Sequence, residues 1–159
     1  MPILTKLKEF LDEHAVRYET LTHAPAFTAQ EVAAAQHVPG RELAKVVIAR
    51  AGERFVMAVL PAFRKLDLAK LGASLPEKAV GLATEEEFAR LFPQCEPGAM
   101  PPFGNLFGLP VYVDASLACD ETIVFQAGTH TETVRLRYAD FTRLVGPTVG
   151  DFTLMREEP

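Results

Sequence analysis

The order of apolar and polar residues changes from a helical period near the start of the chain to strand-like runs in its middle. Four apolar residues recur at helical spacing between charged ones and predict an amphipathic helix over residues 3–14: Leu4, Leu7, Phe10 and Leu11. Residues 43–50 and 54–60 are rich in Val, Ile and Phe, and a short polar turn separates them. This pattern predicts an antiparallel hairpin.

Several further elements follow from the same patterns. Capping boxes at Thr28 with Glu31, and at Thr84 with Glu87, each predict a helix, the first alanine-rich and ending near residues 38–40. Further helices are expected at 67–71 and 138–145, and strands at 16–21, 79–83, 109–113, 122–126 and 133–137. The strands adjoin one another without a regular βαβ rhythm, and no repeat or linker divides the chain. We therefore expect one α+β domain over residues 1–159, with a mainly antiparallel or mixed sheet.

Composition narrows the class of protein. Apolar residues make up 48% of the 159 residues and charged residues 23%, which is typical of soluble globular proteins. No apolar run approaches the roughly 18 residues that would span a bilayer. We therefore expect a cytoplasmic protein without a membrane partner. Cys95 and Cys119 lie 24 residues apart without a CxxC partner, so we expect two free thiols rather than a metal site or a redox motif.

Charge is distributed unevenly along the chain. The net charge is −5, which argues against a general nucleic-acid binder, yet residues 41–78 hold eight basic and four acidic side chains. Such a segment could meet a phosphate-bearing partner locally, or it could be an ordinary solvated face. The sequence leaves both interpretations open.

Lys45 stands inside the β-branched run LAKVVIAR. If Val46 and Ile48 face the core, strand alternation turns Lys45 to the other side, which could simply be solvent. In a pocket, the same ammonium could pair with a phosphate or stabilise a developing oxyanion. Alternation favours the structural interpretation but does not remove the functional one.

Two loops could carry chemistry. The stretch AGTH, residues 127–130, places a glycine, a hydroxyl and an imidazole at a strand end, where a scaffold often presents functional groups; it could also be a plain turn. The stretch PGAMPPFG, residues 97–104, combines prolines that fix the backbone with glycines that allow close approach. It could be a stiff connection or a preformed wall of a pocket.

Together these pieces resemble a known family. Lys45 in LAKVVIAR, the GxxxP loop that begins at Gly98 and continues into PFG, and AGTH followed by ETVRLRYADF occur in the order and approximate spacing of the YbaK/prolyl-tRNA-synthetase-associated domain. The resemblance covers roughly residues 3–147. It implies an α+β fold around a mixed, barrel-like sheet. It also implies an enzyme that hydrolyses the ester between a wrong amino acid and its tRNA, without a metal or organic cofactor.

The resemblance also assigns roles to residues. Lys45 matches the lysine that engages the phosphate near the terminal adenosine, Gly98 offers a backbone amide to the substrate, and Pro102 closes the loop. Gly128 and His130 match the glycine and histidine at the aminoacyl pocket. The expected catalytic residues are thus Lys45, Gly98 and His130, and the expected substrate-binding residues are Pro102, Phe103, Gly128, Thr129, Thr28 and Met100. Thr28 is the least secure of these, because its capping box is a sufficient structural explanation.

The expected substrate is a mischarged tRNA, bound at its acceptor end and carrying a small residue of the alanine, serine or cysteine type. Association with a synthetase such as prolyl-tRNA synthetase is consistent with the family. A non-catalytic module that binds aminoacyl-tRNA or a synthetase is the alternative, and a hydrolase of a smaller activated ester is a third. Oligomeric state, the tRNA species and the choice of amino acid are not determined by the sequence.

Overall fold

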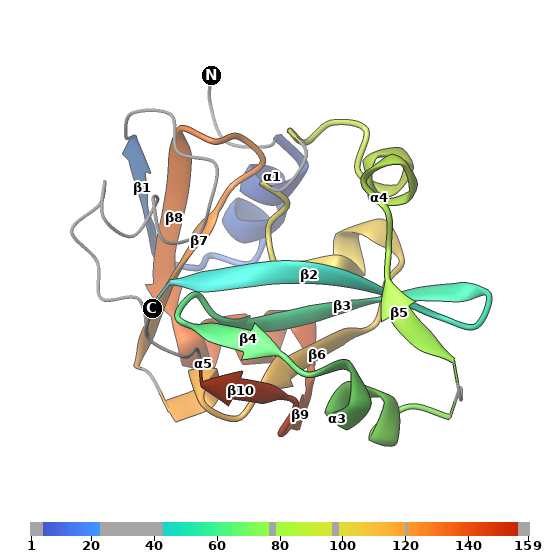
Figure 1. Ribbon diagram of the computed structural model, residues 1–159. Coiled ribbons are helices and arrows are strands. Elements are labelled where there is room, and N and C mark those ends of the chain that lie inside the picture. The colour runs from blue at the N-terminus through green and yellow to red at the C-terminus, as the bar shows by residue number, and fades with distance from the viewer. Residues whose placement is uncertain (1–4, 23–42, 77–78, 97–98, 120, 156–159) are drawn as a thin grey trace.

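The predicted hairpin lies at the centre of the computed structural model (Figure 1), which describes residues 5–22, 43–76, 79–96, 99–119 and 121–155. β2 (Ala44–Ala51) and β3 (Arg54–Pro61) pair antiparallel over their whole length, with Lys45 opposite Leu60. They belong to a sheet with the order β5-β2-β3-β6-β9, completed by β5 (Val80–Leu82), β6 (Val111–Asp114) and β9 (Thr148–Gly150). The β3–β6 and β6–β9 pairs are parallel. The hairpin and the mixed sheet are confirmed.

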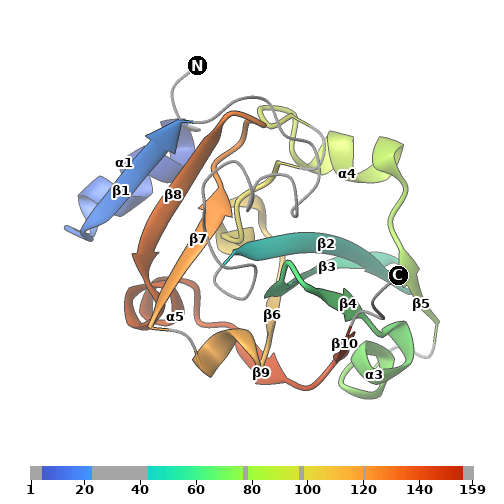
Figure 2. The ribbon, with the colours of Figure 1, turned by 60° about the vertical axis from the view of Figure 1, so that its left-hand side comes forward.

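A second sheet has the order β1-β8-β7 and is antiparallel throughout. Its strands are β1 (Tyr18–Thr22), β7 (Thr122–Gln126) and β8 (Glu132–Arg137), close to the predicted ranges. Figure 2 shows this sheet beside the start of β2, where Leu43 forms a parallel bridge with Val124 of β7. β4 (Arg64–Leu66) pairs with β10 (Thr153–Met155). β4, β9 and β10 were not expected from the sequence.

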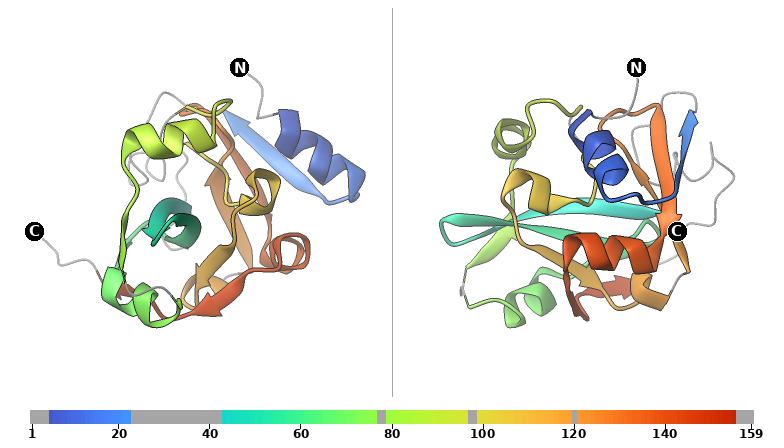
Figure 3. Two further views of the ribbon diagram at one scale, coloured as in Figure 1. Left: turned by 90° about the vertical axis from the view of Figure 1, so that its right-hand side faces the viewer. Right: turned by 180° about the vertical axis from the view of Figure 1, so that it is seen from behind.

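Capping side chains mark the start of two helices. Thr84 and Glu87 form the capping box of α4 (Glu85–Leu91), and Asp67 caps α3 (Leu68–Ala73). α1 (Thr5–Glu13) and α5 (Tyr138–Val145) match their predicted ranges and lie on the near side of the right-hand view in Figure 3. Two 3-10 turns follow the proline-rich loop: η1 (Gly104–Phe107) and η2 (Leu117–Cys119). The helix expected after Thr28 lies outside the described residues.

The five-stranded sheet separates two hydrophobic clusters. Ala44 and Ile48 of β2 pack into the larger cluster together with α1, α5 and the β1-β8-β7 sheet. Ala49 and Ala51 face the smaller cluster, which includes Leu71 of α3 and Phe152. Both faces of β2 are therefore covered over its second half, because side chains alternate along a strand.

The observed fold is α+β with a mixed, mostly antiparallel set of strands, as the sequence predicted. The sheets do not close into a complete barrel over the described ranges. Within those ranges no helix is long and apolar enough to cross a membrane.

Candidate functional site

Backbone hydrogen bonds join the proline-rich loop to the AGTH loop. The amide of Gly128 donates to the carbonyl oxygen of Ala99 at 2.8 Å, and the amide of Glu96 donates to the carbonyl oxygen of Gly128, also at 2.8 Å. Ala99 is fully buried. The two segments, about thirty residues apart in the sequence, therefore form one structural unit, which we call the loop junction (residues 96, 99 and 128–130).

Glu96 adds a side-chain contact to the loop junction. The backbone N–H of His130 donates to Oε1 of Glu96 at 3.3 Å, and the amide of Ala99 donates to the carbonyl oxygen of Glu96 at 3.0 Å. Glu96 thus touches both motifs, whereas sequence reasoning had assigned it no role. The only signal in the sequence was its position immediately before the proline-rich loop.

Position 128 has a backbone conformation that favours glycine. Its φ of +104° lies in a region that residues with a Cβ rarely adopt. In this backbone conformation its amide bonds to Ala99 of the proline-rich loop and its carbonyl oxygen to Glu96 just before that loop. The glycine of AGTH is therefore explained by the geometry of the loop junction.

Thr129 and His130 are largely enclosed, with 7% and 6% of their surfaces exposed. Oγ1 of Thr129 accepts from the amide of Thr131 at 3.4 Å, which is the local capping contact of a turn. The loop thus holds its polar side chains inside the protein rather than in bulk solvent. Burial of this kind fixes their orientation before any substrate arrives.

The proline-rich loop is anchored in the larger hydrophobic cluster. Phe103 has no exposed surface, and its ring lies edge-on to Phe10 and Phe141, with centroids 6.0 and 5.6 Å away. Met100 is 5% exposed and Pro102 is buried. These three side chains hold the loop in place, and almost none of their surface is exposed.

The proline-rich loop ends at Gly104, where there is no room for a side chain. A Cβ at this position would lie 2.7 Å from Cγ2 of Val111 and 3.0 Å from the carbonyl oxygen of Leu109. Real Cβ atoms essentially never show a contact as short as the first, and the second is tighter than most, so the chain needs glycine to pass close to β6. The stiff, small-residue composition therefore has a structural cause at Gly104.

Lys45 lies on β2 on the face opposite to Val46 and Ile48, as alternation predicted. That face is not open solvent, because Val47 packs against the smaller cluster and Leu60, opposite Lys45, is fully buried. Lys45 is half-buried at the start of the strand. The Leu43–Val124 bridge places this start beside β7, the strand that leads into AGTH.

Two predicted site residues, Thr28 and Gly98, lie outside the described residues. Of the others, the structure joins Gly128 to Ala99 of the proline-rich loop and His130 to Glu96 just before it, and it places Lys45 on the strand next to β7. The roles of all of them stay predictions.

Cys95 and Cys119 are both free, as expected. Cys95 adjoins the loop junction, and burial raises the pKa of its thiol to about 11. A thiol with that pKa is almost entirely protonated at neutral pH and is a poor nucleophile. Among the residues described, no group of three or more His, Cys, Asp or Glu side chains is arranged to hold a metal ion.

Comparisons with known proteins give the family and the fold of this chain. A family model described as an aminoacyl-tRNA editing domain matches residues 23–144, a range that includes Lys45 and the loop junction. No curated protein matches the sequence.

Two solved structures share the fold. The crystal structure of a hypothetical protein superimposes with a TM-score of 0.85 at 20% identity, covering 94% of this chain and 99% of the other. A structure described as a candidate trans-editing enzyme for prolyl tRNA synthetase gives a TM-score of 0.79 at 23% identity, covering 94% and 95%. At these identities the likeness shows the fold alone, and the family model shows the family. The chain belongs to the aminoacyl-tRNA editing domain family.

Proposed function

We propose that this protein is a freestanding aminoacyl-tRNA deacylase, which hydrolyses the ester between a mischarged small amino acid and its tRNA. Membership of the editing family supports the reaction class. The observation that carries the proposal is the loop junction, in which Gly128 of AGTH is hydrogen-bonded to Ala99 of the GxxxP loop and to Glu96 just before it. We also propose that the 159 residues form one editing domain.

Hydrolysis of an aminoacyl ester requires little from the protein beyond positioning of the substrate. An aminoacyl ester is already activated, so a site that fixes it against a water molecule and stabilises the tetrahedral oxyanion suffices. In this proposal Lys45 pairs with a phosphate near the terminal adenosine, and the amide of Gly98 holds the ester. Gly128, Thr129 and His130 form the wall of the aminoacyl pocket, and Thr28 contributes a hydroxyl.

The anchored loop supports a small substrate. Pro102, Phe103 and Met100 are buried, so the loop that would border the pocket cannot widen without disturbing the larger hydrophobic cluster. One methylene changes binding by only about 1–3 kcal/mol, which is why synthetases need a second site that excludes the larger, correct residue by size. A rigid wall meets this need. We therefore propose alanine, serine or cysteine as the amino acid removed.

The proposed partner is the acceptor end of a mischarged tRNA. The solved structure described as a candidate trans-editing enzyme for prolyl tRNA synthetase has the same fold and supports an association with that synthetase. A deacylase of charged tRNA would work where tRNA is aminoacylated, so we place the protein in the cytoplasm.

The test is hydrolysis of alanyl-, seryl-, cysteinyl- and prolyl-tRNA by the wild-type protein and by Lys45→Ala. We expect rapid loss of one small aminoacyl group. Lys45→Ala should lower the rate by about 10²-fold or more, because an ester that is no longer held by its phosphate contact is misplaced relative to the attacking water. Lys65→Ala is the matched control, because Lys65 is exposed on β4. It should retain wild-type activity.

The opposite results are equally informative. Binding of charged tRNA without turnover of any ester would overturn the enzyme and leave a binding module. An equal loss of activity in Lys45→Ala and Lys65→Ala would show that net charge matters, rather than a specific contact of Lys45.

A further inference from the structure

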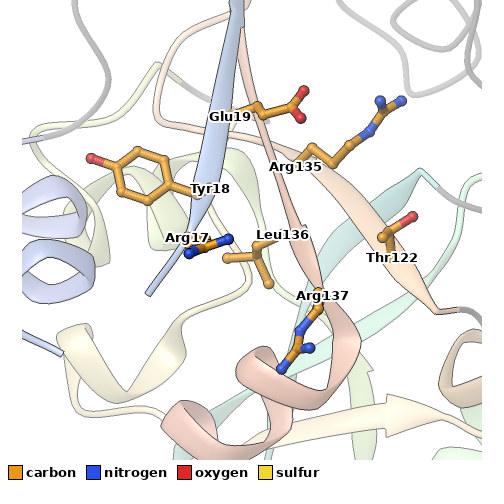
Figure 4. Close-up of a pocket in the computed structure, with 7 residues that line it drawn as sticks. All are labelled: Arg17, Tyr18, Glu19, Thr122, Arg135, Leu136 and Arg137. Carbon is orange, nitrogen blue, oxygen red and sulfur yellow. The ribbon is translucent and has the colours of Figure 1, made fainter. Parts of the chain in front are cut away.

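A cavity of about 270 Å³ lies on the β1-β8-β7 sheet, away from the loop junction. Figure 4 shows its lining residues, which come from the three strands and the residue before β1: Arg17, Tyr18, Glu19, Thr122, Arg135, Leu136 and Arg137. Three of the seven are arginines. We call this cavity the arginine pocket.

Arg135 is the most unusual of the three arginines. Its Nε is buried and has no hydrogen-bond partner in the part of the chain that the structure describes. A buried donor without a partner costs about 1–3 kcal/mol, more when it is charged, and each such group in a native protein calls for an explanation. A bound anion would supply the missing acceptor.

Two carboxylates face these arginines. Glu19 of β1 lies directly opposite Arg135 in the strand register, and Asp140 accepts from Nε of Arg137 at 3.3 Å. Asp140 also pairs with Arg143 at 3.2 Å, so its charge is shared between two cations. The net charge of these two carboxylates together with Arg17, Arg135, Arg137 and Arg143 is therefore positive.

The guanidinium groups are spread over the pocket instead of meeting at one point. In Figure 4, Arg17 and Arg137 lie at one end, while Arg135 extends to the other side beside Glu19. Cations placed in this way suit an anion with several separated charges better than a single phosphate ion. The backbone of a nucleic acid has this form, and arginine is well suited to its phosphates.

The position of the pocket relative to the loop junction fits an RNA that reaches both. β7 begins with Thr122 in the pocket and ends at Gln126, one residue before AGTH. β8 runs back in the opposite direction, from Glu132 to Arg137. Five residues of strand span about 15 Å, so a few nucleotides could connect the two places.

We propose that the arginine pocket binds backbone phosphates of the RNA whose ester lies at the loop junction, through Arg17 and Arg135. This inference rests on the proposed function. The contact is independent of base sequence and contributes to affinity for the whole tRNA, not to the hydrolytic step. The basic segment expected from composition, residues 41–78, lies outside this pocket.

The experiment compares two substrates that carry the same amino acid: full-length misacylated tRNA and the aminoacyl ester of adenosine, which lacks the RNA backbone. We expect the double variant Arg17→Gln/Arg135→Gln to raise KM for the tRNA on the order of tenfold, with kcat unchanged. The slope of log affinity against log salt should fall by about 1–2, as for one or two lost phosphate contacts. Hydrolysis of the adenosine ester should be unchanged, which also shows that the variant folds.

Three further variants sharpen the test. Arg17→Gln alone should show part of the effect, and this exposed residue can be replaced without disturbing the fold. Glu19→Gln should act in the opposite direction and lower KM for the tRNA, because it removes a negative charge opposite Arg135. Arg90→Gln is the charge-matched control, because Arg90 is an exposed residue of α4 paired with Glu86. It should leave KM unchanged.

An unchanged KM and salt slope in the double variant, or an equal effect in Arg90→Gln, would overturn the inference alone. Wild-type protein that hydrolyses neither ester would overturn the proposed function and this inference with it. Calorimetry with inorganic phosphate distinguishes the source of the anion. Saturable binding of free phosphate, lost in the double variant while affinity for tRNA is retained, would show a small-anion site instead.

Discussion

Two carboxylates, Asp114 and Glu96, tie distant parts of this chain together, and their surroundings give them different tasks. Asp114 is 2% exposed; its Oδ1 accepts from the amide of Phe152 at 3.0 Å, and its Oδ2 accepts from the amide of Ser116 at 3.1 Å. Glu96 is exposed, and its side chain accepts one longer bond, from His130. Buried, charge-assisted hydrogen bonds stabilise a fold, whereas an exposed one restrains a loop lightly. The comparison assigns Asp114 to the fold and Glu96 to the candidate site.

The largest expected effect is on stability at Asp114. Asp114→Asn should lower the free energy of unfolding by about 3 kcal/mol, because hydrogen bonds to a charged group are weakened at a buried position near Arg64. Denaturant unfolding measures this loss. Asp151→Asn is the control, since this carboxylate is 75% exposed in its ion pair with Lys70 and should cost less than about 1 kcal/mol. Equal losses in the two variants would remove the distinction between buried and exposed carboxylates.

The same carboxylate predicts a dependence on pH. Burial acts to raise the pKa of Asp114, but hydrogen bonds from Phe152, Ser116 and Thr153 outweigh it and lower the pKa below its ordinary value. A lowered pKa stabilises the folded protein above the unfolded pKa of about 3.9, and this contribution is lost as pH falls through the folded pKa. Between pH 7 and pH 3, the difference in unfolding free energy between wild type and Asp114→Asn should therefore stay constant down to about pH 5 and shrink below about pH 4. A difference that is constant over this range would contradict the assignment.

The next largest effect is expected at Gly128, which belongs to the loop junction and not to the core. Gly128→Ala should cost about 1–3 kcal/mol through its φ of +104°, and it should reduce deacylation further by displacing AGTH from the proline-rich loop. Gly81→Ala in β5 is the control, because a Cβ there meets nothing within 4 Å and φ is ordinary. Activity retained in Gly128→Ala would separate the loop junction from function.

Glu96 should affect activity more than stability. Glu96→Ala should change the unfolding free energy by less than about 1 kcal/mol and lower kcat about tenfold, because a loosened loop junction misplaces the ester. Glu53→Ala, which removes an exposed carboxylate in the β2–β3 turn, should change neither quantity. A stability loss as large as that of Asp114→Asn, with kcat unchanged, would make Glu96 structural as well.

The smallest effect reports the loop junction directly. Because burial raises the pKa of Cys95 to about 11, iodoacetamide at pH 8 should modify the exposed Cys119 well before Cys95. In Glu96→Ala the rate at Cys95 should rise a few-fold as the neighbouring loop opens, which mass spectrometry of the labelled peptides measures. An unchanged rate would show that Glu96 does not hold the loop junction closed.

Local patterns predicted the long elements of the fold well. The β2–β3 hairpin, β7 and α5 follow apolar runs or amphipathic spacing. The capping box of Thr84 and Glu87 marks the residue at which α4 begins. The motifs at Lys45, Gly98 and AGTH sufficed to suggest the editing family, which the family model then showed. These features are determined by neighbours in the sequence, so the sequence alone reveals them.

Other features depend on residues that only folding brings together. β4, β9 and β10 are three residues each, too short for any periodicity, and they exist because partners elsewhere in the chain pair with them. The contact of Glu96 with His130 and the grouping of Arg17 with Arg135 likewise join residues far apart in the sequence. The sequence by itself determined the element types and the family of this protein. The tertiary structure decided which carboxylate is buried, which loops meet and where the arginines gather, because burial and contact are properties of packed neighbours.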